Sequence, residues 1–210
     1  LIGNTVFRMV LKQIAAWLAT GLEIPRIAIN VSAHQLRDGD FVEKVAGWLE
    51  ESGVPASYIG VELTESALME RIDVVRDMLV ELGLMGISLS VDDFGTGYSS
   101  LAYLRKLPIH ELKVDRSFVN GIAYEPDDRS IGKAVIEMGH ALGLRVVGEG
   151  VENEAQLEVL QQEGCDIVQG FRFYRPLAAD EFAETVRRGG DRSYFFRSQD
   201  EDTSESRTLA

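Results

Sequence analysis

Apolar residues recur along the chain in two alternating patterns. Where they fall three or four positions apart they predict amphipathic helices, and where they form short continuous runs they predict buried strands. The first helical pattern covers residues 6–21 and ends at Gly21. Its predicted apolar face consists of Val6, Val10, Ile14, Trp17 and Leu18.

The alternation continues to residue 190. Strands are predicted over residues 27–32, 58–65, 86–94, 111–115, 145–151 and 166–171. Helices are predicted over residues 40–53, 72–83, 99–107, 128–143, 153–164 and 179–190, and Asp40 with Glu43 resembles a capping box at the start of the first of these. Regular alternation predicts an α/β fold with parallel strands and crossover helices. Six strands fit either an open doubly wound sheet or a barrel that lacks its first units.

Length, composition and net charge limit which kinds of protein this chain can be. The 210 residues, 45% of them apolar, suit one domain at residues 1–190, followed by a polar and acidic tail at residues 191–210 that we expect to be disordered. No apolar run predicts a membrane span, and the first residues show no signal-peptide pattern. The single cysteine, Cys165, favours a reducing, cytoplasmic compartment. The net charge of −13 argues against polymeric nucleic acid as a partner, but not against a small phosphate ligand bound through cations.

Each predicted strand carries a polar residue near its carboxyl end, directly after an apolar stretch. These residues are Asn30, Glu62, Asp92, Lys113, Glu149 and Gln169. In barrels of parallel strands, chemistry gathers at the carboxyl ends of the strands, so we expect these side chains to meet at one rim. Carboxylates that meet repel one another unless a positive charge lies between them, and hard oxygen ligands suit Mg²⁺ or Mn²⁺. The strand ends therefore predict a divalent metal site.

Two adjacent aspartates, Asp92 and Asp93, make the stretch VDDFGTGYSSL distinctive. Strand alternation places Asp92 on one face with Ser88 and Ser90, and predicts that Asp93 points the other way, toward the loop. Such a pair suits two metal ions about 3.5–4 Å apart, an arrangement used for phosphoester cleavage. Lys113 at the same rim would orient the attacking water or balance the negative charge.

The motifs as a set resemble a known family. They are NVS at residues 30–32, ELTES at 62–66, DDFGTGYSSL at 92–101, LKVDRSFV at 112–119, GEGVE at 148–152 and QGFRFYRP at 169–176. In this order and at this spacing, from about residue 1 to residue 186, they resemble the EAL-domain cyclic-di-GMP phosphodiesterases. The resemblance implies a variant TIM (β/α)8 barrel, seen here without its first strands, and hydrolysis of cyclic di-GMP to linear pGpG with two Mg²⁺ or Mn²⁺ ions.

The resemblance also assigns roles to individual residues. It implies one metal held by Asn30, Glu62 and Asp92, and a second held by Asp92, Asp93 and Glu149. It implies that Lys113 contacts the nucleophilic water, that Gln169 lies beside the site, and that Glu65 anchors the glycine loop. It places Glu152 near the catalytic site and Arg175-Pro176 on a substrate-side loop, and it implies a homodimer formed through the loop and helix after Asp93.

One departure from the family pattern bears on activity. The Glu-Ala-Leu motif, which supplies a further metal-ligand glutamate on an earlier strand in this family, is absent from residues 1–210. We interpret the chain as a cytoplasmic fragment of a longer, membrane-associated signalling protein, with that motif upstream. If the whole protein lacks the motif, a non-catalytic receptor or scaffold is the alternative. An unrelated metal-assisted barrel enzyme is a weaker alternative, because it would not account for the whole run of motifs.

Overall fold

The computed structural model describes residues 2–69, 72–97 and 101–189, and the predicted tail at residues 191–210 lies outside them. Within the described residues, six parallel strands form one sheet in the order β1-β2-β3-β4-β5-β6. They are β1 (Ile27–Asn30), β2 (Ile59–Thr64), β3 (Ser88–Phe94), β4 (Glu111–Val114), β5 (Arg145–Gly148) and β6 (Ile167–Val168). A doubly wound sheet reverses its strand order at a switch point, so the unbroken order excludes that alternative.

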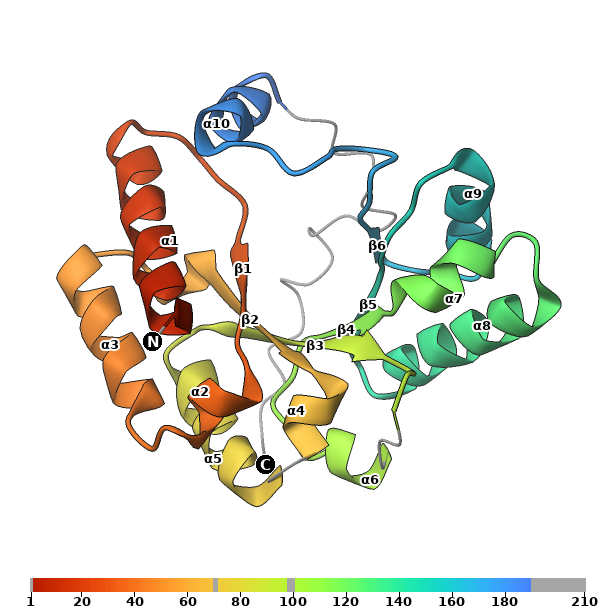
Figure 1. Cartoon of the computed structure of the whole chain (residues 1–210), viewed down its shortest axis with the longest axis horizontal. Coiled ribbons are helices and arrows are strands. Elements are labelled where there is room, and N and C mark those ends of the chain that lie inside the picture. Colours follow the sequence, from red (N-terminus) through yellow and green to blue (C-terminus); the bar gives the residue numbers. More distant parts are fainter. Residues whose placement is uncertain (1, 70–71, 98–100, 190–210) are drawn as a thin grey trace.

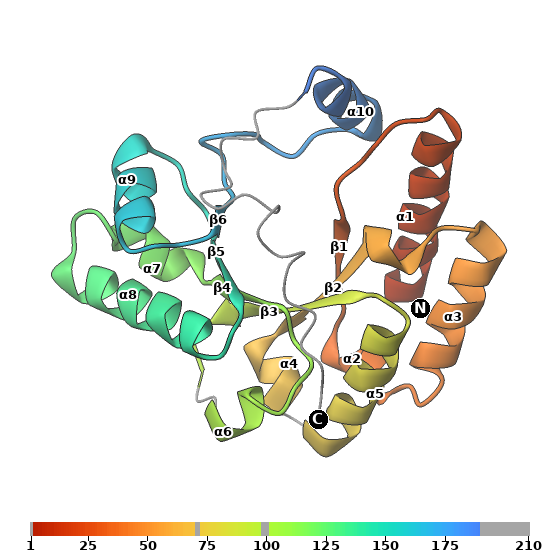
Figure 2. The ribbon, with the colours of Figure 1, turned by 180° about the vertical axis from the view of Figure 1, so that it is seen from behind.

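The helices lie outside the curled sheet (Figure 1). They are α1 (Ile2–Ala19), α2 (Ala33–Arg37), α3 (Phe41–Ser52), α4 (Glu65–Met69), α5 (Ile72–Leu84), α6 (Leu101–Leu104), α7 (Arg116–Gly121), α8 (Pro126–Ala141), α9 (Glu154–Gln162) and α10 (Ala179–Arg187), with a 3-10 turn at Ala56–Tyr58. Figures 1 and 2 show α10 between α1 and the β6 edge, and its Phe182 ring packs against Trp17 with the ring centroids 5.0 Å apart. The fold is therefore a partial α/β barrel.

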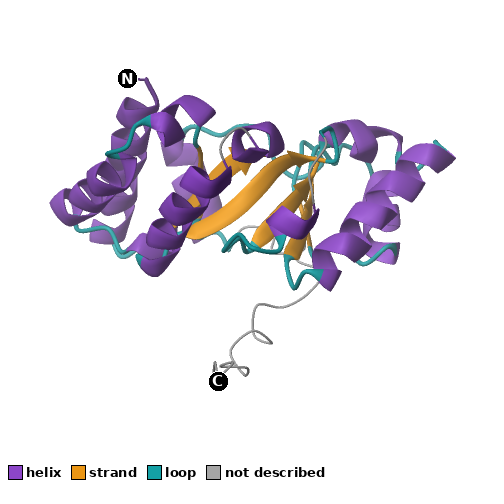
Figure 3. Ribbon diagram, turned by 90° about the horizontal axis from the view of Figure 1, so that it is seen from below, coloured by secondary structure: helices purple, strands orange, loops and turns teal. Residues whose placement is uncertain are grey.

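The two faces of the central strands differ in chemistry. Val61, Leu63, Leu89 and Val91 are at most 1% exposed and belong to the hydrophobic core. The residues between them alternate to the opposite, inner face, where Glu62 of β2 lies in register with Ser90 of β3. Figure 3 shows the strands running side by side between two groups of helices. Parallel strands in sequential order bring their carboxyl ends to one rim.

Some local predictions were wrong. The buried face of α1 consists of Phe7, Leu11 and Ile14, whereas Val6 is 44% exposed. Val6 was placed on the apolar face because it lies four positions before Val10 and eight before Ile14, but the buried stripe of the helix runs through Phe7 and Leu11 instead. No side-chain hydrogen bond of Asp40 caps α3; its carboxylate pairs instead with Lys44, with Oδ1 and Nζ 2.7 Å apart.

The third error concerns the end of α5, which continues one residue beyond the expected Gly83. The residue with left-handed backbone geometry is Gly86, at φ 91°. The prediction also missed the short helices α2, α4 and α7, which directly follow β1, β2 and β4.

No helix among the described residues is long and apolar enough to cross a lipid bilayer.

Candidate metal centre

Four side chains from four strands or strand ends converge at the inner rim. The Lys113 Nζ lies 3.0 Å from Glu62 Oε1, 3.4 Å from Asp92 Oδ1 and 2.5 Å from Glu149 Oε1. The Lys113 side chain is 7% exposed, and the three acidic side chains are 13–14% exposed. One ammonium group therefore shares its charge among three nearly buried carboxylates.

Asp93 joins this group although strand alternation predicts that it points away. The β3–β4 register shifts between Val91 and Phe94, and Asp93 has a left-handed backbone conformation at φ 54°. This irregularity lets one carboxylate oxygen each from Asp92, Asp93 and Glu149 lie within 4.8 Å of the other two. A non-glycine residue with positive φ costs conformational energy, so the backbone is strained at the residue that completes the cluster.

The cluster perturbs the ionisation of its members. Burial raises the pKa of Glu149 to about 7, because the nearby charge of Lys113 only partly offsets desolvation and repulsion from Asp92 and Glu62. Burial also raises the pKa of Glu62 against the opposing effect of Lys113. The pKa of Lys113 is itself raised, because Glu62, Glu149 and Asp92 together outweigh its desolvation. The group thus holds more negative charge than one lysine neutralises.

The glycine loop after Asp93 is tied to α4 by a buried carboxylate. Glu65 is 2% exposed, and its Oε2 accepts hydrogen bonds from the backbone N–H groups of Gly95 at 3.0 Å and Gly97 at 3.2 Å. Gly95 has φ 100°, a conformation that favours glycine, and a side chain there would contact Phe118. The Gly-x-Gly sequence therefore lets this turn close onto Glu65.

Gln169, like Lys113, contacts Glu149 directly. Its Nε2 lies 2.5 Å from Glu149 Oε1, and its backbone N–H donates to the carbonyl of Gly148. Asn30 is paired in register with Glu62 at the same level of the sheet, with an exposed side chain. Both residues thus lie at the rim to which the sequence assigned them.

The other predicted residues lie farther from the carboxylates. Arg175 stacks over the exposed ring of Phe171, with 5.0 Å between the guanidinium carbon and the ring centroid, and Pro176 follows it on the exposed loop after β6. The side chain of Glu152 is exposed, and its backbone N–H donates to Gln156 Oε1. The structure does not bring Glu152, Arg175 or Pro176 into contact with the metal-ligand candidates.

Sequence reasoning missed Asp115. This residue caps α7 by accepting a hydrogen bond from the Ser117 backbone at 2.9 Å, and its own backbone N–H donates to the carbonyl oxygen of Phe94, next to Asp93, at 3.5 Å. Burial and the negative charges of Asp92 and Asp115 raise the pKa of Asp93. The D-x-S pattern directly after β4 is a recognisable helix cap that could have located α7 and this acid.

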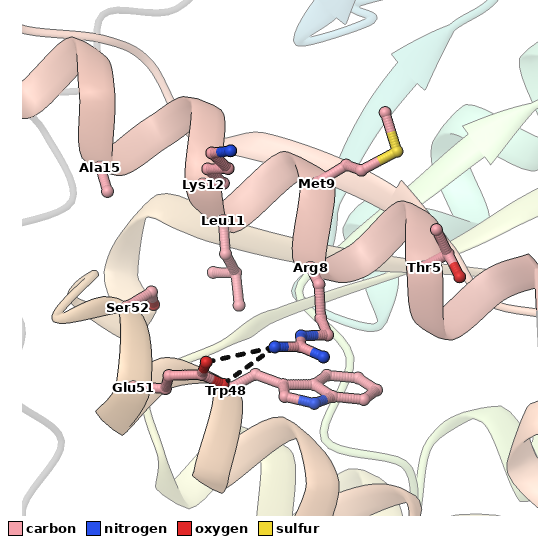
Figure 4. A pocket seen from close by; sticks show the side chains of 9 residues that line it. All are labelled: Thr5, Arg8, Met9, Leu11, Lys12, Ala15, Trp48, Glu51 and Ser52. Atoms are coloured by element: carbon pink, nitrogen blue, oxygen red, sulfur yellow. Dashed lines mark hydrogen bonds and ion pairs between the residues drawn. The ribbon is translucent and has the colours of Figure 1, made fainter.

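A separate surface pocket of about 480 Å³ lies between α1 and α3 (Figure 4). It is lined by Thr5, Arg8, Met9, Leu11, Lys12, Ala15, Trp48, Glu51 and Ser52. An exposed ion pair between Arg8 and Glu51, with 3.2 Å between Nη2 and Oε1, lies at this pocket. Exposed pairs of this kind contribute little energy, so the perturbed ionisable groups of the rim are the better candidate for chemistry.

A family model and individual relatives match most of this chain and agree on one protein family. The model of the EAL domain family matches residues 1–176. The cyclic di-GMP phosphodiesterase NbdA of Pseudomonas aeruginosa is 44% identical over 87% of this chain and 24% of its own length. The bifunctional diguanylate cyclase/cyclic di-GMP phosphodiesterase MucR of the same species is 41% identical over 88% of this chain and 27% of its own length. The chain thus spans about a quarter of the length of these relatives.

Solved structures resemble the fold as well as the sequence. The PaMucR phosphodiesterase in its c-di-GMP complex superposes with a TM-score of 0.82 at 42% identity, covering 86% of this chain and 73% of that one. The EAL domain of Mycobacterium smegmatis DcpA superposes with a TM-score of 0.84 at 39% identity, covering 90% of this chain and 85% of that one.

Proposed function

The chain belongs to the EAL domain family, and on that premise we propose that the protein containing it hydrolyses cyclic di-GMP to linear pGpG with two bound Mg²⁺ or Mn²⁺ ions. The names of its relatives support hydrolysis of this dinucleotide. The observation that carries the proposal for this chain is the convergence of carboxylate oxygens of Asp92, Asp93 and Glu149. Lys113 contacts two of these three residues.

The donor set fits a small divalent cation. Octahedral Mg²⁺ binds oxygen at about 2.1 Å, which places neighbouring ligand oxygens about 3 Å apart and opposite ones about 4.2 Å apart. The carboxylate oxygens of Asp92, Asp93 and Glu149 already lie within a similar range. We assign Asp92, Asp93 and Glu149 to one ion, and Asn30, Glu62 and Asp92 to the other. When bound, such ions lower the pKa of water and offset charge on the phosphate oxygens.

The chain's own residues act around those ions. Lys113 is buried, cationic and directed at three acids, so it is placed to orient a water molecule and to balance charge as the phosphate changes. Gln169 fixes the orientation of Glu149, and Glu65 fixes the loop that follows Asp93. Glu152 stays a candidate catalytic residue near the rim.

The loop after β6 suits the nucleotide side of the substrate. The Phe171 ring is 53% exposed two residues beyond Gln169, with the Arg175 guanidinium on it and Pro176 next in sequence. Aromatic rings and arginine planes stack on nucleobases, and arginine also pairs with phosphate. We assign Phe171, Arg175 and Pro176 to substrate binding.

The proposed reaction opens one of the two phosphodiester links. Water adds to phosphorus, the bond from phosphorus to the 3′ oxygen breaks, and that oxygen takes a proton to become a hydroxyl group. The product is a linear dinucleotide with a 5′-phosphate. We further propose that the protein acts as a homodimer through the loop and helix after Asp93; residues 98–100 of that loop lie outside the described part of the chain. The domain is assigned to residues 1–190 and to the cytoplasm, within a larger signalling protein.

The test uses the full-length protein and chromatographic detection of pGpG with Mn²⁺. We expect Glu62→Ala and Glu149→Ala to abolish turnover, whereas Glu158→Ala, which changes an exposed acid on α9, leaves it unchanged. Calcium should bind and support little turnover, since its looser coordination misplaces the water. Wild-type rates in either site variant would contradict the site assignment. Tight binding of cyclic di-GMP without cleavage by the wild-type protein would favour the receptor alternative.

A further inference from the structure

Gln156 is a buried polar residue outside the carboxylate cluster. It lies in the first turn of α9 and is 4% exposed. Its Oε1 accepts hydrogen bonds from the backbone N–H groups of Glu152 at 2.7 Å and Asn153 at 3.2 Å. Its Nε2 donates to the carbonyl oxygen of Asn120 at 3.3 Å. One side chain therefore joins the loop after β5 to the last turn of α7.

Both segments joined by Gln156 lead directly to the rim. The loop after β5 begins with Glu149. The cap residue of α7, Asp115, donates its backbone N–H to the carbonyl oxygen of Phe94, next to Asp93, at 3.5 Å. The loop and the start of α7 touch closely, because a side chain at Gly150 would lie 2.8 Å from the Cβ of Arg116. Movement of either segment would shift a carboxyl group of the cluster.

The capping box at α9 explains only part of this arrangement. In that box the Asn153 side chain accepts from the Gln156 backbone and Gln156 accepts from the Asn153 backbone, which satisfies the start of the helix. The bond to Asn120 and the shorter bond to Glu152 reach beyond the box. They make the side chain a bridge between two elements that are about 36 residues apart in sequence.

We propose that Gln156 is a positioning residue of the metal centre, which holds Glu149 and Asp93 at the separation that a divalent cation requires. The proposal rests on the proposed function only in assigning Glu149 and Asp93 as ligands. Loss of an outer partner of a metal ligand typically weakens metal binding 10- to 100-fold. Because Gln156 acts through a short loop, we expect an effect near the lower end of that range.

The experiment compares three variants of the full-length protein. Gln156→Met keeps the length of the side chain and removes its hydrogen bonds. Gln156→Glu keeps an oxygen acceptor for Glu152 and Asn153, as glutamate does in other capping boxes. Asn153→Ala removes the other half of the box and leaves the bridge of Gln156 intact.

The first readout is the Kd for Mn²⁺, measured by electron paramagnetic resonance without substrate. We expect Gln156→Met to raise this Kd about 5- to 10-fold, and the Kd of Gln156→Glu to lie nearer to that of the wild type. The Kd of Asn153→Ala should stay within twofold of the wild-type value, although its Tm falls by as much as that of Gln156→Met. In turnover assays Gln156→Met should lower kcat with KM nearly unchanged. An unchanged Kd in Gln156→Met, or an equal rise in Asn153→Ala, would overturn the proposal.

A second readout needs no variant. The amide protons of Glu152 and Asn153 in the wild-type protein should exchange at least about 100-fold more slowly than in an unstructured peptide, because both donate to Gln156. Unprotected amides there would contradict the bridge even if Gln156→Met did not fold. If the wild-type protein binds Mn²⁺ but does not cleave cyclic di-GMP, the proposed function fails while the Kd comparison still tests Gln156.

Discussion

Replacement of Lys113 by methionine should expose how much the acidic rim depends on a cation. Methionine keeps most of the length and apolar volume of the side chain but removes its charge. In the wild-type structure the ammonium lies 2.5–3.4 Å from three carboxylates that are nearly buried. At an effective dielectric constant of about 20, one such pair at 3 Å interacts by about 5.5 kcal/mol.

The net cost is smaller than the sum of the three contacts. Desolvation of Lys113 already opposes them, and the carboxylates take up protons once the ammonium is gone. Removal of one partner from a buried ion pair typically costs about 3–5 kcal/mol. We therefore expect Lys113→Met to lower the free energy of unfolding by that amount in EDTA. Saturation with a divalent cation at 100 times Kd stabilises any protein that binds it by about 2.7 kcal/mol, the wild type included. Because the cation replaces the missing ammonium as counter-charge, the variant should gain more stability from Mg²⁺ than the wild type does, so that its loss relative to the wild type shrinks.

Urea denaturation at pH 8, with EDTA or with saturating Mg²⁺, measures both effects. The matched control is Lys133→Met on α8, because Lys133 is half exposed and pairs with Glu163 at 3.1 Å. Surface pairs contribute about 0–1 kcal/mol, and this control, whose rim is intact, should gain as much stability from Mg²⁺ as the wild type does. The reasoning would be refuted if Lys113→Met lost no more stability than Lys133→Met, or if its loss were the same with and without Mg²⁺.

Three further predictions concern single side chains. Glu65→Gln removes the negative charge to which two backbone amides donate, and should lower the free energy of unfolding in urea by about 1–2 kcal/mol. The exposed control Glu81→Gln should not change it, and an equal loss in both variants would contradict the prediction. Burial raises the pKa of Cys165 to about 12, so mass spectrometry after thiol alkylation at pH 8 should find it unmodified until urea unfolds the domain, and rapid native labelling would refute its burial. Phe171→Ala should raise the KM for cyclic di-GMP about 5- to 50-fold with kcat retained, as loss of one base stack of about 1–2.3 kcal/mol requires; an unchanged KM would remove Phe171 from the substrate site.

Much of the fold follows from patterns that the sequence shows directly. The six strands are short apolar runs, and each falls where the alternation of helix and strand predicts it. Gly53 and Gly143 have left-handed backbones just after α3 and α8, as expected for glycines that end helices. The choice between barrel and doubly wound sheet depends on which strands pair, and that long-range information is absent from local periodicity.

Some residues of the candidate site could likewise be placed from the sequence, and others could not. Glu62, Asp92, Lys113 and Glu149 could be placed at one rim, because strand direction and alternation are regular. Asp93 was assigned to the wrong face, because its positive φ and the shift in the β3–β4 register break the alternation rule at that residue. Asp115 and Gln156 act through contacts between elements distant in sequence, which helix and strand patterns do not encode.

The central claim is that the rim of Asp92, Asp93, Glu149 and Glu62 binds divalent cations. The most direct measurement is the anomalous scattering of Mn²⁺ in crystals of the protein soaked with manganese. The account predicts a peak within about 2.3 Å of carboxylate oxygens of Asp92 and Glu149, absent after Asp92→Asn. An empty rim at saturating Mn²⁺, or a peak bound only by residues elsewhere, would contradict it.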